Sequence, residues 1–255
     1  MIHPTACVHP SAELGAHVNI GEFAVIEAGS RIGTSCRIGA HAIVDGYTTL
    51  GEKCRVFPGA AVGLEPQDLK FAGERTYLRI GDRTVIREFA TLNVATSPEE
   101  ATVVGTDCLL MAYSHVAHNC TVGNHVIMAN SANLAGHVVV EDYVTVGGVT
   151  AVHQFARMGC HSFIGGGSRI PQDVAPYTLV AGNPVRLAGL NLIGLKRRGF
   201  DAETLEALEL AFRFVFRSKL LVGDARARAR DQVPHLPEVV RFLDFVEPSR
   251  RGITR

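Results

Sequence analysis

Tryptophan is absent from the 255 residues, and aromatic residues make up only 7% of them, whereas glycine is frequent at 26 residues. Few large rings combined with many glycines, valines and isoleucines argue against a packed helix bundle and favour tight, repeated turns. Lys plus Arg and Asp plus Glu number 25 each, so the formal net charge is zero. A chain without net positive charge is not expected to coat nucleic acid.

Long hydrophobic runs are also missing, because no stretch reaches the roughly 18 apolar residues of a membrane-spanning helix. The N-terminal MIHPTACVHPSAEL lacks the basic stretch followed by an apolar one that marks a secretory signal. We therefore expect no transmembrane segment and a cytoplasmic location. No C-x-x-C pair is present, so the sequence carries no zinc-ribbon signal.

The dominant pattern is an aliphatic residue at nearly every sixth position from Ile2 to Ile170, with breaks at Asp68, Glu74 and Pro98. Glycine often follows the aliphatic residue, and a small or β-branched residue stands four positions after it. This period fits neither a helix face nor a hairpin array. It is typical of a solenoid in which three short strands close one triangular coil and the aliphatic side chains fill the interior.

The cysteines follow the same pattern rather than a disulfide framework. Four of them stand in the small, inward-facing position four residues after the aliphatic one: Cys36, Cys54, Cys108 and Cys120. We predict that these four are buried and reduced.

With this repeat, the chain resembles the hexapeptide-repeat acyltransferases, which fold as left-handed parallel β-helices. The left hand is implied by the resemblance, since the general rule for parallel crossovers favours the right hand. We expect an all-β left-handed parallel β-helix with a small C-terminal α-helical domain. So thin a prism has little interior, and a homotrimer that buries its flat sides is expected.

The β-helix is predicted over residues 1–185 and the helical domain over 186–255. Two polar insertions, at 64–79 and 93–103, interrupt the repeat. A regular solenoid gains nothing from such loops, and loops on rigid scaffolds often carry function.

The C-terminal part shows helical signals. Asp201 is predicted to cap a helix, and an apolar stripe follows at helical spacing: Leu205, Leu208, Phe212, Val215 and Phe216. The arginine-rich segment 224–230 is predicted to form a second helix. Pro237 is predicted to open a third, with four inward-facing residues: Val239, Val240, Leu243 and Val246.

Histidines gather at one place in the repeat. His118, His137 and His153 each follow an aliphatic position within three residues, and those positions are one coil apart. They are therefore predicted to lie on three successive coils of one edge, about 5 Å apart per coil, with His115 just before the same corner. Two chemistries fit such a cluster. A neutral imidazole can act as a general base, and three imidazoles can hold zinc, as in hexapeptide-repeat carbonic anhydrases.

Longer motifs favour a general base over a zinc site. LLMAYSHVAHNCTVGN (109–124), NLAGHVVVEDY (133–143), GGVTAVHQF (147–155), GLNLIGLKRRGF (189–200) and PQDLKFAGE (66–74) resemble the bacterial UDP-N-acetylglucosamine O-acyltransferase family, whose enzymes catalyse the first step of lipid A synthesis. The likeness runs from the first repeat to the C-terminal RGITR. Many acetyltransferases share hexapeptide repeats, but the combination of these motifs is specific.

The resemblance implies that an acyl chain, which can carry a 3-hydroxyl group, moves from the thioester of acyl carrier protein to the sugar 3-hydroxyl of UDP-N-acetylglucosamine, without metal or cofactor. The matching general base is His118, and the family pattern gives the backbone N–H of Gly136 as oxyanion donor. Gly166 aligns with the position that acts as the acyl-chain ruler, where glycine leaves room for a longer chain. The implied substrate contacts are Gln67, Asp68, Lys70, His115, His137, His153, Gln154, Asn191, Arg197 and Arg198, and the role of His153 stays open. Lys70, Arg197 and Arg198 suit a diphosphate because fixed cations pair with phosphate oxygens.

Three positions depart from the family pattern. Asn119 follows the base where many members have Asp, Ile193 stands where some carry Glu, and Val94 replaces an arginine. An asparagine can orient groups by hydrogen bonds, but it cannot stabilise an imidazolium as a carboxylate does. These departures bear on affinity and acceptor choice more than on the type of reaction.

Alternatives remain open from the sequence. One is a related hexapeptide acyl- or acetyltransferase with another acceptor, such as a 3-amino sugar nucleotide, or with coenzyme A as donor. Another is a metal-binding trimer like a carbonic anhydrase. Exposed arginines at 224–230 are expected to help dock the acidic carrier protein. Acyl length and the preference for 3-hydroxylation are not fixed by the sequence.

Overall fold

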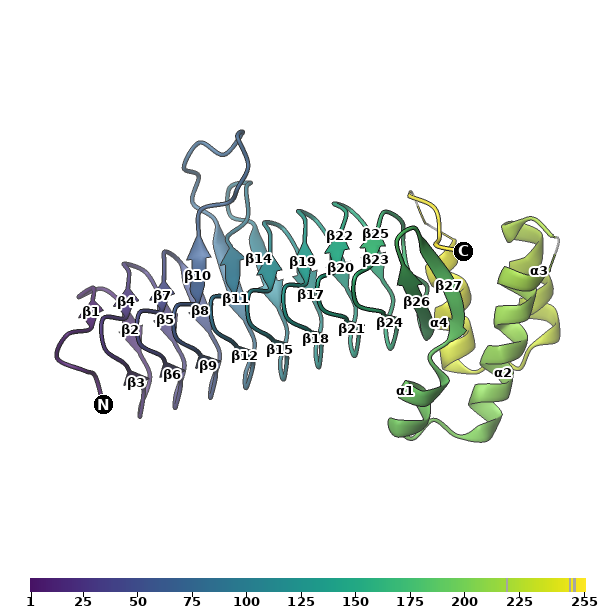
Figure 1. Ribbon diagram of the computed structural model, residues 1–255, viewed down its shortest axis with the longest axis horizontal. Coiled ribbons are helices and arrows are strands. Elements are labelled where there is room, and N and C mark those ends of the chain that lie inside the picture. Colours follow the sequence, from purple (N-terminus) through teal and green to yellow (C-terminus); the bar gives the residue numbers. More distant parts are fainter. Residues whose placement is uncertain (219, 248, 250) are drawn as a thin grey trace.

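Short parallel strands stack into three long sheets that enclose a prism in the described part of the chain, which is residues 1–218, 220–247, 249 and 251–255 of a computed structural model (Figure 1). The first sheet has the order β1 (Cys7–Val8), β4 (Val25–Ile26), β7 (Ile43–Val44), β10 (Ala61–Leu64), β13 (Thr91–Asn93), β16 (His115–Val116), β19 (Asn133–Leu134), β22 (Ala151–Val152) and β25 (Arg169–Ile170).

The other two sheets repeat this arrangement. The second has the order β2 (Glu13–Leu14), β5 (Arg31–Ile32), β8 (Thr48–Leu50), β11 (Tyr77–Ile80), β14 (Ala101–Val104), β17 (Thr121–Val122), β20 (Val139–Val140) and β23 (Arg157–Met158). The third has the order β3 (Asn19–Ile20), β6 (Arg37–Ile38), β9 (Arg55–Val56), β12 (Val85–Ile86), β15 (Leu109–Leu110), β18 (Ile127–Met128), β21 (Thr145–Val146), β24 (Phe163–Ile164), β26 (Thr178–Gly182) and β27 (Val185–Leu190).

The register of these strands follows the hexapeptide repeat. Val116 pairs with Leu134 of the next coil, and Leu134 pairs with Val152 of the one after. The side chains of Val116 and Leu134 are completely buried inside the prism. The predicted parallel β-helix, with aliphatic residues inside and short strands on three sides, is therefore confirmed.

Residues at the corners of the prism adopt a left-handed backbone conformation. On one edge these are Asn119 (φ 58°), His137 (φ 60°) and Phe155 (φ 64°). Asparagine tolerates this conformation, whereas bulky residues adopt it only when their surroundings compensate the strain. Here the rings of His137 and Phe155 stack on each other from neighbouring coils, with their centroids 4.7 Å apart. The corner conformation thus directs side chains outward in a row along the edge.

The cysteines behave as predicted. Cys36, Cys54, Cys108 and Cys120 are buried and unpaired with one another by disulfides. All four thiols donate hydrogen bonds to carbonyls of the next coil, for example from Cys54 to Gly81 at 3.2 Å and from Cys108 to Gly123 at 3.1 Å. These inward thiols therefore help to join successive coils.

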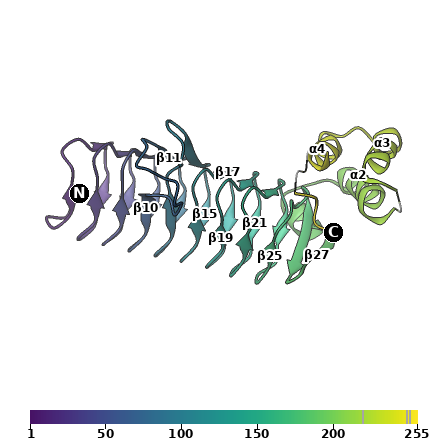
Figure 2. The same cartoon turned by 90° about the horizontal axis from the view of Figure 1, so that it is seen from above.

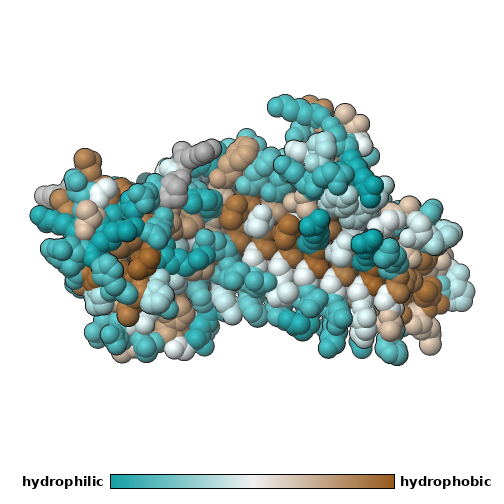
Figure 3. All heavy atoms as spheres, turned by 180° about the vertical axis from the view of Figure 1, so that it is seen from behind, coloured by the Kyte–Doolittle hydropathy of each residue, from teal (hydrophilic) through white to brown (hydrophobic). Residues whose placement is uncertain are grey.

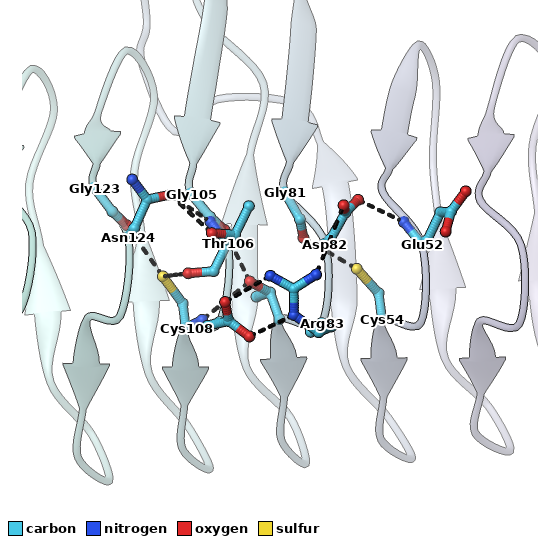
Figure 4. A network of polar contacts seen from close by, with 12 residues as sticks. Glu52, Cys54, Gly81, Asp82, Arg83, Gly105, Thr106, Cys108, Gly123 and Asn124 are labelled. Carbon is cyan, nitrogen blue, oxygen red and sulfur yellow. Dashed lines mark hydrogen bonds and ion pairs between the residues drawn. The ribbon is translucent and has the colours of Figure 1, made fainter.

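Polar side chains also tie successive corners together on the outside of the prism, along the edge between the second and third sheets (Figure 4). Arg83 donates two hydrogen bonds of 2.7 Å to Asp107 of the next coil. Asp82, the residue before Arg83, binds the preceding coil, because it accepts a hydrogen bond of 2.8 Å from the backbone N–H of Glu52. Such links hold the coils in register where no aliphatic side chain can.

The end of the prism carries a hairpin and a group of helices (Figures 1 and 2). Strands β26 and β27 pair antiparallel, in contrast to the parallel pairs before them. The helices are α1 (Leu192–Arg197), α2 (Ala202–Phe212), the π-helical η1 (Arg213–Arg217), α3 (Val222–Gln232) and α4 (Pro237–Val246). Within the described ranges, none of them has the length and apolarity needed to cross a membrane.

Several sequence predictions for these helices are confirmed. Asp201 is the N-cap of α2 and accepts a hydrogen bond of 2.8 Å from the N–H of Thr204. The arginine-rich segment is helical in α3, and Pro237 is the first residue of α4. The prediction that Val240 faces inward is wrong, because this side chain is 40% exposed. The buried stripe of α4 instead includes Phe242, which leaves Val240 on the flank of the helix.

Candidate active site

The histidine edge, defined as the corners at 117–120, 135–138 and 153–156, lies between the first and second sheets. Both insertions leave the prism from this same edge. The first loop (65–76) connects β10 to β11, and the second loop (94–100) connects β13 to β14. In Figure 1 the two loops rise from the coils on one side. The loops and the histidines thus share one edge of the prism.

Three of the four predicted histidines lie together. The ring centroids of His118 and His137 are 5.2 Å apart, and their planes are nearly perpendicular. His115 precedes them on β16, where its Nδ1 lies 2.7 Å from the hydroxyl oxygen of Thr91. His153 lies on the next coil of the same edge, exposed, with its Nδ1 3.2 Å from the carbonyl of Gln154. The predicted placement on three successive coils is confirmed.

Hydrogen bonds fix the tautomer of His118. Its Nδ1 lies 2.9 Å from Oδ1 of Asn119. That oxygen also accepts a hydrogen bond from the backbone N–H of Thr96 at 3.1 Å, so it is an acceptor and Nδ1 must carry the proton. The other ring nitrogen, Nε2, therefore holds a free lone pair. An imidazole in this form is ready to accept a proton from a hydroxyl group.

Gly136 makes room for this imidazole on the next coil. A β-carbon at position 136 would lie only 2.5 Å from both Nε2 and Cε1 of His118. The backbone N–H of Gly136 donates no hydrogen bond to another residue in the described part of the chain. The lone pair of His118 Nε2 and the N–H of Gly136 therefore belong to neighbouring coils of one edge, and both are open to a substrate. Acyl transfer uses two such groups, a base and an oxyanion donor.

Burial favours the neutral form of the two neighbouring imidazoles. It lowers the pKa of His115 and of His137, and the positive charge that His118 acquires on protonation lowers both further. The carboxylates of Glu100 and Asp68 act in the opposite direction on the pKa of His137. These two carboxylates come from the second and first loops, so both loops bring negative charge toward the histidine pair.

The loop residues implied by the family resemblance lie at the surface of the first loop. Gln67 and Lys70 are exposed, and Asp68 is half-buried. Oδ1 of Asp68 accepts a hydrogen bond of 3.0 Å from the N–H of Lys70, which forms a local turn. Between them, the side chain of Leu69 is fully exposed.

The basic residues of the C-terminal segment lie on another edge of the same chain, here called the tyrosine edge after the corner residues Tyr143 and Tyr177. The guanidinium of Arg198 sits 4.4 Å from the ring centroid of Tyr143. Asn191 caps α1 and donates a hydrogen bond of 3.0 Å to the carbonyl of His161 on this edge. Arg197 is the exposed last residue of α1. One chain alone does not bring these residues to His118.

Gly166 lies in the corner after β24, on the third edge of the prism, between the third and first sheets. A β-carbon there would lie 3.1 Å from the carbonyl oxygen of Gly148 on the preceding coil, and no other atom beyond its chain neighbours would be closer.

Of the departures from the family pattern, Val94 is buried at the start of the second loop and Ile193 is 69% exposed in α1. Val94 therefore belongs to the core and Ile193 to the surface of the helix.

The second loop supplies contacts that the sequence did not reveal. Thr96 and Glu100 both bind the amide of Asn119, the residue after the candidate base. Their place in an insertion beside the repeat was the only sequence signal, since nothing in their spacing shows which way the loop folds.

The histidines are not arranged as metal ligands. Within the described ranges, no three His, Cys, Asp or Glu side chains are placed to hold an ion.

Titration of His161 on the tyrosine edge is expected to make stability depend on pH. Burial and the charge of Arg198 lower its pKa from 6.5 to about 4, and its Nδ1 is buried without a hydrogen-bond partner among the described residues. The unfolded chain therefore binds this proton more readily, so the stabilising contribution is full above pH 6.5 and is lost as the pH falls toward about 4.

Thermal unfolding measured across that range tests this expectation. His161→Phe, whose ring can stack in the same place between Tyr143 and Tyr177, should show a smaller fall in Tm on acidification. His41→Phe, in an exposed stack with Phe23, should show the same fall as the unchanged protein. Parallel curves for His161→Phe and the unchanged protein would contradict the assignment.

A β-helix of hexapeptide repeats with an oriented histidine on one edge is typical of a hexapeptide-repeat acyltransferase. Comparisons with known proteins agree. A family model described as UDP N-acetylglucosamine O-acyltransferase, domain 2, matches residues 173–254, and one described as bacterial transferase hexapeptide (six repeats) matches residues 101–136.

Whole-chain relatives narrow the class to one family. An acyl-[acyl-carrier-protein]–UDP-N-acetylglucosamine O-acyltransferase of Stenotrophomonas maltophilia is 44% identical, over 100% of this chain and 97% of its own length. Among solved structures, LpxA from Acinetobacter baumannii is 38% identical with a TM-score of 0.96, covering 100% of this chain and 99% of its own. UDP-N-acetylglucosamine acyltransferase from Campylobacter jejuni is 36% identical with a TM-score of 0.94 and the same coverage.

The chain belongs to the acyl-[acyl-carrier-protein]–UDP-N-acetylglucosamine O-acyltransferase family, and it is an acyltransferase. This confirms the predicted fold class, a left-handed parallel β-helix with a small C-terminal helical region. It also confirms the resemblance on which the predicted reaction rested. A coenzyme A-dependent acetyltransferase and a carbonic-anhydrase-like trimer are not favoured by these relatives.

Proposed function

We propose that this protein transfers an acyl chain from acyl carrier protein to the 3-hydroxyl of UDP-N-acetylglucosamine, the first step of lipid A synthesis. The observation that carries the proposal is the imidazole of His118, whose Nδ1 is held by Asn119 so that Nε2 is free beside Gly136. Relatives named for this reaction align with the whole chain. A cytoplasmic location, where carrier protein and nucleotide sugar meet, is part of the proposal.

The reaction follows from the position of the base. Nε2 of His118 takes the proton of the sugar 3-hydroxyl while that oxygen attacks the thioester carbon. The N–H of Gly136 stabilises the oxyanion of the tetrahedral intermediate. As the intermediate collapses, the C–S bond breaks and the leaving thiolate recovers the proton from the imidazolium. Acyl transfer of this kind is balanced without a covalent acyl-enzyme.

Substrate contacts come from all sides of the site in this proposal. On the histidine edge and first loop they are Gln67, Asp68, Lys70, His115, His137, His153 and Gln154. The diphosphate is bound by Lys70 together with Arg197 and Arg198, because fixed cations pair with phosphate oxygens. Asn191 contributes a further nucleotide contact.

A homotrimer brings the two sets of residues together. In one chain, Arg198 packs on Tyr143 of the tyrosine edge, whereas His118 belongs to the histidine edge. The third sheet also presents half-buried apolar residues outward, namely Val85, Leu109, Ile127 and Phe163. Figure 3 shows apolar residues as a band along the coils on one face. Burial of such surface between copies supports assembly.

A transfer assay tests the proposal. Purified protein is incubated with UDP-N-acetylglucosamine and with carrier proteins that bear acyl or 3-hydroxyacyl chains of several lengths, and the product is identified by mass spectrometry. An acylated nucleotide sugar that forms only with the carrier-protein donors is expected. Product only with the 3-amino sugar nucleotide, or only with acetyl-coenzyme A, would assign the chain to another acceptor or donor.

Gly166 sets the acyl length in this proposal. Gly166→Met would extend a side chain outward past the carbonyl oxygen of Gly148, which lies 3.1 Å from the β-carbon position, so the preferred donor should become shorter by several carbons. The ratio of kcat/KM for long and short donors is expected to fall by about 10-fold or more, since each methylene in an apolar pocket is worth about that much. Gly223→Met, in the exposed part of α3, is the control. An unchanged ratio would remove Gly166 from the acyl site.

A further inference from the structure

The second loop places a carboxylate near the candidate base, with only the side chain of Asn119 between them. Nδ2 of Asn119 donates a hydrogen bond of 2.6 Å to Oε2 of Glu100. Oδ1 of the same amide faces Nδ1 of His118 at 2.9 Å. A continuous row of polar groups therefore runs from the free Nε2 of His118, through its ring and the Asn119 amide, to the Glu100 carboxylate.

The hydrogen bonds at both ends of the Asn119 amide have a fixed direction. Because a carboxylate accepts hydrogen bonds and does not donate them, Glu100 must bind the NH₂ group of Asn119 and so turns its oxygen toward His118. The N–H and hydroxyl of Thr96 bind that oxygen as well, at 3.1 Å and 2.8 Å. The left-handed backbone at Asn119 and the hydrogen bond of 2.8 Å from its N–H to Thr102 hold the amide in place.

We propose that Glu100 is a positioning residue that supplies, through the amide of Asn119, the negative charge that favours the protonated imidazole of His118 during transfer. Resting on the proposed function, this inference explains how a chain with an asparagine after its base retains a carboxylate for that base. A carboxylate held beside a histidine orients the ring and stabilises the imidazolium. Here the amide of Asn119 stands between the two groups.

Other charged groups face the same imidazole and must be separated from Glu100. His115 and His137 interact electrostatically with His118, and Asp68 approaches His137 from the first loop. None of these three is hydrogen-bonded to the Asn119 amide in the described part of the chain. Glu99, the neighbour of Glu100, instead accepts a hydrogen bond of 2.9 Å from the hydroxyl of Tyr77.

The first test removes the charge of Glu100 and keeps the shape. Glu100→Gln is expected to lower kcat about tenfold with little change in the KM for UDP-N-acetylglucosamine, because the imidazolium forms only during the chemical step. The acid limb of the kcat/KM profile should also move to lower pH. Glu99→Gln is the matched control and should leave both unchanged.

The second test moves the carboxylate. Asn119→Asp alone would set two carboxylates against each other at the distance of one hydrogen bond, so they would share a proton and activity should fall. In Asn119→Asp/Glu100→Gln, the amide introduced at position 100 can donate to the new carboxylate, which binds His118 directly. This double variant should recover kcat to within about threefold of the unchanged protein and move the acid limb to higher pH.

The outcomes separate this inference from the proposed function. If the unchanged protein transfers acyl chains, but Glu100→Gln keeps the kcat and the acid limb, Glu100 has no positioning role. A double variant no better than Asn119→Asp would also overturn the inference. If the unchanged protein makes no product with any donor, the proposed function itself fails and this inference fails with it.

Discussion

His118→Ala is expected to lower the rate of acyl transfer by about 10²- to 10⁴-fold, the usual contribution of a general base. The imidazole is oriented by Asn119 with Nε2 free, and no second histidine of the cluster has this arrangement, since His115 and His137 are turned to Thr91 and Phe155. The KM for UDP-N-acetylglucosamine should change little. Steady-state transfer rates with purified protein provide the measurement.

A matched histidine elsewhere controls for loss of an exposed ring. His41→Ala removes a histidine that stacks on Phe23, with their ring centroids 5.2 Å apart, on another edge. It should retain the full rate. A His118→Ala protein that keeps more than about a tenth of the activity, with normal folding and assembly, would show that another group removes the proton.

Gly136→Ala is expected to reduce kcat by about 100-fold while the protein remains folded. The added methyl group would lie 2.5 Å from Nε2 of His118, so the ring must move away from its position. Position 136 is not among the glycines with a positive φ, so the backbone accepts alanine without strain. The backbone N–H survives this substitution, and the loss therefore measures the displacement of the base.

Gly46→Ala provides the comparison for Gly136→Ala. A β-carbon at Gly46 meets no atom within 4 Å, so this substitution should leave kcat unchanged. Unfolding temperatures of both variants close to that of the unchanged protein would show that the effect is local. Full activity of Gly136→Ala would mean that the site accommodates the methyl group and that His118 is not confined as described.

The fold follows from the sequence because each coil repeats the same six-residue pattern. An aliphatic residue every six positions fixes which side chains are buried, and the pairing of Val116 with Leu134 and Val152 follows from that spacing alone. The same arithmetic places the histidines on one edge. The hand of the helix does not follow from the period, and it came from the likeness to a known family. The inward prediction for Val240 is wrong because a helix of ten residues offers two neighbouring faces and only packing selects one.

The candidate site was less predictable than the fold. Glu100 and Thr96 belong to a loop without a repeat, and only the folded loop brings them to Asn119. Asn119 therefore looked like a simple loss of charge in the sequence, whereas the structure shows a carboxylate bound to its far side. The separation of Arg198 from His118 onto two edges also depends on where the chain goes after β27.

Transfer to an acceptor that differs only at the reacting position tests the central claim most directly. The unchanged protein and His118→Ala are each given a 3-hydroxyacyl carrier protein with UDP-N-acetylglucosamine or with its 3-deoxy analogue. One product is expected, esterified at the sugar 3-oxygen, formed by the unchanged protein from the complete acceptor and nearly absent in the other three reactions. Equal acylation of the 3-deoxy analogue, or equal rates with and without His118, would contradict it.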